Sequence, residues 1–191
     1  MPNASSADVL EFWFGPPDVA PTKRKEWFGK APEFDAEIRR RFEPLIGRAA
    51  AGACDDWRVS ARDALALCIV LDQFPRNSYR GSPRAFATDA KALAVARDSI
   101  DRGFDRLLSP VERVFVYLPL EHAEDVACQD LSVRLFDSLP DDADSESARD
   151  YARRHRDIVV RFGRFPHRND ILGRTSTPEE LAFLREPGSS F

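Results

Sequence analysis

The sequence predicts an all-α fold, and three observations support that prediction. Helix start signals recur, most clearly at Ser109–Glu112 and Thr177–Glu180, where a Ser or Thr N-cap precedes a Pro and a Glu closes a capping box. Apolar residues return at helical spacing in several segments. No segment alternates apolar and polar residues between hairpin turns, so we expect no strands.

The N-terminal part of the chain is expected to hold three helices. The first covers Ser6–Phe14 and leads into an irregular Pro-rich segment, residues 15–32. The second covers Glu33–Ala50, with a kink or an early end at Pro44. The third covers Ser60–Phe74 and is apolar nearly all round, which is typical of a buried central helix. The apolar face of the second helix consists of Phe34, Ile38, Phe42, Leu45 and Ile46.

Four more helices are expected before the last one. They cover Ala90–Arg102, Pro110–Leu118, Glu124–Ser138 and Glu146–Phe162. The chain should bend at Pro119, because proline removes a backbone donor and clashes with the preceding turn. An acidic loop, residues 141–144, precedes the long helix. We expect four of its side chains to face inward, namely Tyr151, Ile158, Val159 and Phe162.

The last helix should cover Thr177–Arg185 and end before Pro187, leaving residues 186–191 as a short tail. Helix pairs joined by short loops favour an α-helical array over a four-helix bundle. The 191 residues fit a single domain, residues 1–191.

The composition limits the classes of partner. Hydrophobic residues make up 43% and charged residues 31%, an ordinary balance for a soluble globular domain. The net charge of -4 predicts neither a nucleic-acid nor a membrane partner, because both attract basic surfaces. Cys54, Cys68 and Cys128 are odd in number and form no Cys-x-x-Cys pair, so we expect neither disulfides nor a zinc site made of them. The N-terminal Met-Pro-Asn-Ala-Ser-Ser does not resemble a signal peptide, and a cytoplasmic location is the default.

One short pattern occurs twice. Residues 73–81 and residues 164–174 both read Phe-Pro, then Arg-Asn, then a Gly four residues after the Asn. Proline should stop the preceding helix in each case, the Asn suits a turn, and Gly81 and Gly173 can supply a positive φ. Two similar helix terminators would explain the pattern without any function.

Charged residues near these turns suggest more than a terminator. Asp72 lies at the C-terminal end of an apolar helix, where a carboxylate needs a cationic partner, and Arg76 and Arg80 are close in sequence. The turns also hold five arginines, Arg76, Arg80, Arg164, Arg168 and Arg174. If the turns meet, their guanidinium groups would frame an anion site; alternatively, Arg and Asp pair internally and hold two loops together.

A third polar segment surrounds His122. The bend at Pro119 would re-aim Glu121, His122 and Glu124, a composition that suits a metal site, an acid–base pair or a hydrogen-bonded structural His. The spacing matches no strong metal motif such as His-Glu-x-x-His, and we expect no metal ligands. His155, which lies among several arginines, is expected on a solvated helix face.

Taken together, these segments resemble one family, the bacterial domain-of-unknown-function family 924. The resemblance runs in order from Val9 to Leu184 and rests on Phe12–Gly15 with Trp27-Phe28, Asp72–Asn77, Tyr117–Pro119 with His122, Glu124 and Gln129, and Phe162–Asn169 with Leu172–Arg174. It implies a tetratricopeptide-like right-handed array of antiparallel helix pairs, and it implies no activity. The resemblance also implies a Ser directly after His122, where this chain has Ala123.

Two classes of function compete. In the first, a small-molecule enzyme or binding protein holds an anionic ligand at the paired turns. Its catalytic residues would be His122, His167 and Asp72, and its ligand-binding residues Arg76, Asn77, Arg80, Arg164, Arg168, Asn169, Arg174 and Glu124. In the second, an interaction module holds a peptide or protein in a groove of the helical array.

We favour the first class, because two turns so rich in polar residues need more explanation than a peptide groove provides. Convergence of Arg76, Arg168 and His122 would support it, whereas arginines consumed in internal pairs would support the second class. The chain has neither Gly-x-x-x-x-Gly-Lys-Ser/Thr nor Gly-x-Gly-x-x-Gly, so we expect no nucleotide cofactor, and none of another kind. A Gly-x-Ser-x-Gly nucleophile motif is also absent.

Overall fold

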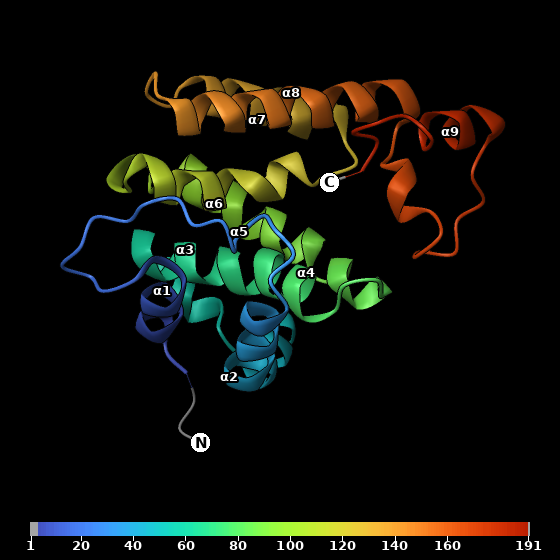
Figure 1. Ribbon diagram of the computed structural model, residues 1–191. Helices are drawn as coiled ribbons and strands as arrows, with labels where there is room; N and C mark the ends of the chain where they lie inside the picture. Colours follow the sequence, from blue (N-terminus) through green and yellow to red (C-terminus); the bar gives the residue numbers. More distant parts are fainter. Residues whose placement is uncertain (1–3, 191) are drawn as a thin grey trace.

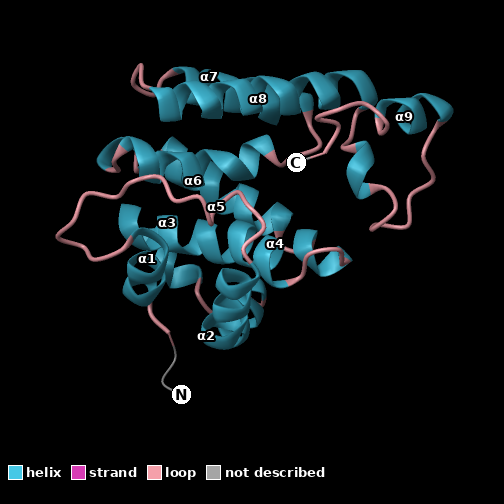
Figure 2. Ribbon diagram, viewed as in Figure 1, coloured by secondary structure: helices cyan, strands magenta, loops and turns pink. Residues whose placement is uncertain are grey.

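The computed structural model describes residues 4–190 (Figure 1). These residues form helices and connecting turns and no strand, which confirms the all-α prediction (Figure 2). The helices are α1 (Ser6–Phe14), α2 (Pro32–Ala50), α3 (Ala61–Cys68), α4 (Phe74–Ser78), α5 (Asp89–Asp101), α6 (Pro110–Glu121), α7 (Val126–Asp137), α8 (Ala143–Phe162) and α9 (Pro178–Phe183). Met1, Pro2 and Asn3 of the N-terminal segment, and Phe191 of the expected tail, lie outside the described residues.

Local capping signals place several helix ends where the sequence predicts them. Ser60 accepts a hydrogen bond from the Asp63 backbone N–H at the start of α3. Thr177 and Glu180 form the expected capping box at the start of α9. The predicted start of α7 at Glu124 is two residues early, because the Asp125 carboxylate caps the helix by accepting from the Cys128 N–H.

Neighbouring helices pack on one another along the chain. α6 packs on α7 and α7 on α8, and Figure 1 shows α7 and α8 at one end of the molecule, with α6 between them and α3. α3 packs on both α1 and α5, and α2 packs on α4 at the other end. Every residue from Ala64 to Pro75 is buried, so the central helical segment is the core, as predicted.

An aromatic cluster ties the irregular segment 15–32 to this core. The fully buried Trp13 of α1 stacks on Trp27, with ring centroids 5.9 Å apart, and Trp27 meets the edge of Phe115 in α6 at 4.9 Å. The Trp27 indole N–H also donates to the Trp13 carbonyl at 3.1 Å. A loop with few backbone hydrogen bonds of its own is therefore anchored by burying an aromatic side chain.

Two prolines lie inside continuous helices. α2 continues through Pro44, so the helix does not end early. α6 continues through Pro119 to Glu121, past the expected end at Leu118. Each proline costs its helix a hydrogen bond, but the buried face of the helix outweighs that local cost. His122 is therefore placed by the end of α6, where it is the C-cap residue.

Tyr151 does not face inward, because its side chain is 45% exposed. The buried face of α8 instead contains Ala152, His155 and Val159, which recur at spacings of three and four residues. Ile158 is buried as predicted. Within the described residues, no helix combines the length and the apolar character needed to cross a bilayer.

The core can be tested with one substitution at two positions. Leu67→Ala should lower the free energy of unfolding by about 2–5 kcal/mol, because Leu67 is fully buried in α3 and truncation leaves a cavity. Leu107→Ala, at a side chain that is 75% exposed, should change it by less than about 0.5 kcal/mol. Urea denaturation followed by circular dichroism measures both. Equal losses would contradict the position of α3 in the core.

Candidate functional site

Asp72 lies in a π-helical turn, Ile69–Gln73, that joins α3 to α4. The Phe74 N–H donates to the Ile69 carbonyl, five residues back, so the helix widens here. The wide turn places Pro75 in the first turn of α4, where its missing N–H needs no partner, and the predicted helix stop at this proline is wrong. Such π-turns often occur at functional sites.

The Asp72 carboxylate is 1% exposed and has three side-chain partners. Its Oδ1 lies 2.8 Å from His122 Nδ1 and 3.1 Å from Arg76 Nη1, and its Oδ2 accepts from the Gln73 amide at 2.6 Å. Burial alone would raise the pKa of Asp72, but Arg76 and His122 together hold it below its usual range. The ionised carboxylate accepts the hydrogen of His122 Nδ1, which leaves the lone pair of His122 on Nε2.

Arg76 and Arg168, one from each Phe-Pro turn, converge on Asp89 at the start of α5. Arg76 donates to both Asp89 oxygens, at 2.8 and 3.0 Å, and Arg168 Nη1 donates to Oδ2 at 3.2 Å. A continuous chain of hydrogen bonds and ion pairs thus runs from His122 through Asp72, Arg76 and Asp89 to Arg168. The two turns meet, and Asp89, which the sequence did not single out, joins them.

The Arg168 guanidinium group lies close to two aromatic rings. Its guanidinium carbon lies 4.7 Å from the centre of the Phe86 ring and 4.6 Å from that of Phe165. Its Nε is buried and has no hydrogen-bond acceptor among the described residues. Burial and the charge of Arg76 lower the pKa of Arg168 to about 10, so it stays protonated at neutral pH. The two rings stabilise the cation through cation–π contacts, and its Nε donor remains unused within residues 4–190.

His155 lies on the buried face of α8, and the prediction of a solvated His is wrong. Its side chain is 5% exposed, with Nδ1 donating to the Tyr151 carbonyl at 2.8 Å and lying 3.2 Å from Glu121 Oε1. The arginines at 153, 154 and 156 are its neighbours in sequence but point to other sides of the helix. The spacing of Ala152, His155 and Val159 was the signal that could have revealed it.

Glu121, at the end of α6, is 3% exposed beside His155. Burial, and then the negative charge of Asp72, raises the pKa of Glu121 to about 8. Burial lowers the pKa of His122, with Arg76 adding to the effect, and burial holds the pKa of His155 well below its usual value. At neutral pH the cluster of Glu121, His122 and His155 therefore contains two neutral imidazoles and a protonated carboxyl group.

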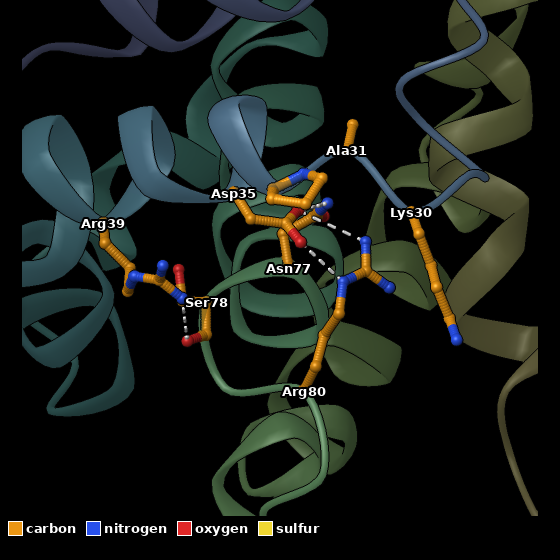
Figure 3. A pocket seen from close by; sticks show the side chains of 8 residues that line it. Lys30, Ala31, Asp35, Arg39, Asn77, Ser78 and Arg80 are labelled. Carbon is orange, nitrogen blue, oxygen red and sulfur yellow. Dashed lines mark hydrogen bonds and ion pairs between the residues drawn. The ribbon is translucent and has the colours of Figure 1, made fainter.

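The remaining predicted residues of the first turn lie elsewhere. Arg80 Nε and Asn77 Nδ2 each donate to the carboxylate of Asp35 in α2, both at 2.7 Å. They border a cavity of about 290 Å³, shown in Figure 3, where the Arg80 guanidinium points toward the Asp35 carboxylate. Asn77 is buried inside α4, so the prediction of a turn residue is wrong, whereas Gly81 has the expected positive φ of 72°.

The second turn contains two arginine–glutamate pairs that join it to other segments, and we call such ion pairs clasps. Arg174 forms two bonds with the Glu124 carboxylate, at 2.6 and 2.9 Å, and a third with the Asn169 side-chain oxygen. Arg164 forms two bonds with Glu180 of α9, at 2.6 and 2.8 Å. The helix before this turn ends at Gly163, with φ of 70°, rather than at the proline. These arginines join loops, as the internal-pair alternative expected.

His167 is the other predicted catalytic residue. Its ring lies 5.7 Å from that of Phe165, whose ring in turn lies 5.5 Å from His155. Burial and the charge of Arg168 lower the pKa of His167 to about 4, so it is neutral at physiological pH. The structure therefore brings Asp72, His122, Arg76 and Arg168 into one site, with His167 at its margin.

The family comparison agrees with the sequence resemblance. Residues 9–188 match the family described as "Bacterial protein of unknown function (DUF924)". The chain belongs to this family. No curated protein matches the chain.

One solved structure is similar to this chain in both sequence and fold. It is described as "Structure of Protein of Unknown Function ATU0120 from Agrobacterium tumefaciens" and is 43% identical. The similarity covers 94% of this chain and 96% of that chain, with a TM-score of 0.83. The relative therefore supports the fold over nearly the whole chain and brings no activity with it.

The Arg164–Glu180 clasp makes stability depend on pH. Glu180→Gln should lower the free energy of unfolding at neutral pH by about 2 kcal/mol, because Arg164 loses a charged partner. Arg164 lowers the pKa of Glu180 from 4.5 to about 2. The contribution is therefore complete above pH 4.5 and is lost as the pH falls toward 2. The difference between wild type and variant in urea denaturation should close over that interval.

Glu179→Gln is the matched control. Glu179 binds Arg161 through one exposed contact, so its loss should cost less than about 1 kcal/mol. A Glu180→Gln effect that is as small as this, or that persists unchanged at pH 2, would show that the clasp does not stabilise the fold.

Proposed function

We propose that this protein binds a small anionic molecule beside His122 and acts on it as an acid–base enzyme. The observation that carries the proposal is the buried Asp72–His122 pair, joined through Arg76 and Asp89 to the underused guanidinium group of Arg168. The His122 segment, Asp89 and both Phe-Pro turns contribute to this arrangement, and they lie far apart in the sequence.

His122 has the properties of a general base in this site. Asp72 fixes its tautomer and orientation through Nδ1, so the Nε2 lone pair is the reactive atom. Because burial lowers its pKa, the imidazole is neutral at physiological pH and can accept a proton. Its side chain is 13% exposed, whereas that of Asp72 is 1% exposed, so His122 is the member of the pair that a ligand can reach.

Arg168 is the binding group for the anion, and Arg76 supports it. Arg76 already satisfies Asp72 and both oxygens of Asp89, so its donors are largely used. Arg168 makes one long bond to Asp89, and its contacts with two rings limit the entropy it loses on binding a carboxylate or phosphate. Asn77, Arg80, Arg164, Asn169, Arg174 and Glu124 then act as structural supports.

A peptide- or protein-binding module is the alternative, and the internal pairs favour it. Arg80, Arg164 and Arg174 are bound to Asp35, Glu180 and Glu124. We also propose that the helices form a tetratricopeptide-like right-handed array of antiparallel helix pairs. The packing of successive helices on one another supports this arrangement. A cytoplasmic location belongs to the same proposal and rests on the sequence composition.

Thermal shift tests the anion site. Phosphate, phosphorylated metabolites and dicarboxylates are screened, and a ligand at about 100 times its dissociation constant should raise the melting temperature of the wild type by roughly 5–10 °C. Arg168→Ala should abolish that shift, because it removes the guanidinium group. His122→Ala should retain most of the shift and lose any turnover of the same compound.

Arg153→Ala is the matched control, since Arg153 is an exposed arginine paired with Asp137 and should leave the shift unchanged. The proposal fails if no anion stabilises the wild type. A lower melting temperature of Arg168→Ala without any ligand effect would then identify Arg168 as a clasp and direct the search to protein partners.

A further inference from the structure

The proposed acid–base pair leaves two buried polar side chains unused, those of Glu121 and His155. Glu121 lies beside His155, and no Lys or Arg pairs with it in the part of the chain that the structure describes. Buried carboxyl groups are costly unless a cation or several hydrogen bonds satisfy them. A buried carboxyl beside two imidazoles is instead the composition of a metal-binding centre.

We propose that Glu121, His122 and His155 bind one divalent metal ion, with zinc as the ion that best fits this ligand set. One ligand atom from each of the three side chains lies within 4.8 Å of the other two. Two His and one Glu form a ligand set of catalytic zinc sites, which keep a fourth position for water or substrate. Ligands about 2.1 Å from zinc lie about 3.4 Å apart, so the side chains move together on binding. The Glu121 carboxylate, whose Oε1 lies 3.2 Å from His155 Nδ1, turns toward Nε2 of the same ring.

The groups behind these ligands give the strongest support. Metal-bound histidines almost always donate their other ring N–H to a carboxylate or a backbone carbonyl. His122 donates from Nδ1 to Asp72, at 2.8 Å, and His155 donates from Nδ1 to the Tyr151 carbonyl, also at 2.8 Å. Both rings are therefore held in the tautomer that carries the lone pair on Nε2. The structure therefore provides the expected hydrogen-bond acceptor behind each of the two histidines.

The backbone at the ligands is also fixed. The buried Gln129 amide donates to the carbonyls of Glu121 and Ala123, at 2.6 and 2.8 Å. These bonds hold the turn on both sides of His122, while His155 is held in the rigid helix α8. A ligand set built from a helix end and a second helix 33 residues later has no short linear motif, which is why spacing alone did not reveal it.

In its catalytic part the inference rests on the proposed anion site, and it changes the role of His122. The metal would occupy the Nε2 lone pair that accepts a proton in the metal-free protein, so His122 is a metal ligand when the ion is bound and a base only without it. Binding of the ion does not depend on the anion site, but its catalytic use does. As a Lewis acid beside Arg168, the ion would polarise an oxygen of the anionic ligand. The substrate class is then an oxygen-bearing anion, such as a carboxylate or a phosphate ester.

Zinc titration of the chelator-treated protein tests this site. Isothermal calorimetry should give one zinc ion per chain, and zinc should raise the melting temperature of the wild type. His155→Ala and Glu121→Gln should each weaken binding by more than about 100-fold, since they remove ligands, and Asp72→Asn should weaken it by about 10–100-fold. His167→Ala, a histidine outside the ligand set, should bind zinc like the wild type.

Circular dichroism and the melting temperature in chelator show whether each variant folds. Cobalt(II) gives a check on the wild type alone: strong visible d–d absorption is expected for a four-coordinate site, and the weak absorption of a six-coordinate ion would overturn the inference. Zinc affinity that is unchanged in His155→Ala, or equally reduced in His167→Ala, would also overturn it.

Repeating the anion screen in chelator separates the two proposals. An Arg168-dependent shift without stoichiometric zinc binding would overturn the metal site and leave the anion site standing. One zinc ion per chain without any anion shift would support the metal site and contradict the proposed function.

Discussion

The Asp72 carboxylate, buried in the wide turn between α3 and α4, determines the geometry of the whole site. A buried ionised carboxylate is stable only with close donors, and here Arg76, His122 and Gln73 supply them. The same contacts give His122 its tautomer and fix Arg76, which in turn positions Asp89. Loss of the single carboxylate would therefore release the imidazole and leave the Arg76 charge with one partner fewer.

Charge balance explains how an anion site and a metal site can lie side by side. Asp72 and Asp89 are compensated by Arg76 and Arg168, so this chain of residues carries no net charge, and the nearby imidazoles are neutral. A divalent ion held by an ionised Glu121 would add one positive charge, which a singly charged anionic ligand would cancel. Each proposed occupant thus lowers the electrostatic cost of the other.

Local signals made most helices predictable, whereas long-range partners were not. Caps such as Ser60 and Thr177 act within one turn and are visible in the sequence. The burial of His155 depends on which face of α8 meets α6 and α7, so its arginine neighbours misled the prediction. The need of Asp72 for a cation was predictable, but the convergence of Arg168 on Asp89 joins residues 79 positions apart.

The two Phe-Pro turns show why a repeated sequence need not mean a repeated structure. Pro75 lies inside a continuing helix, whereas Pro166 begins a 3-10 turn after the helix has ended at Gly163. Arg76 of the first turn and Arg168 of the second reach the shared centre, where both guanidinium groups lie over the Phe86 ring.

A later arginine of each turn goes to a carboxylate outside that centre, Arg80 to Asp35 and Arg174 to Glu124, and the Asn of the same turn binds a member of that pair. The clasp and the anion site are alternatives only at the level of a single arginine, because each turn contains both a clasp and a residue of the proposed site. The clasps hold in place the segments from which Arg76 and Arg168 extend, so the internal pairs help to make the central arrangement rigid.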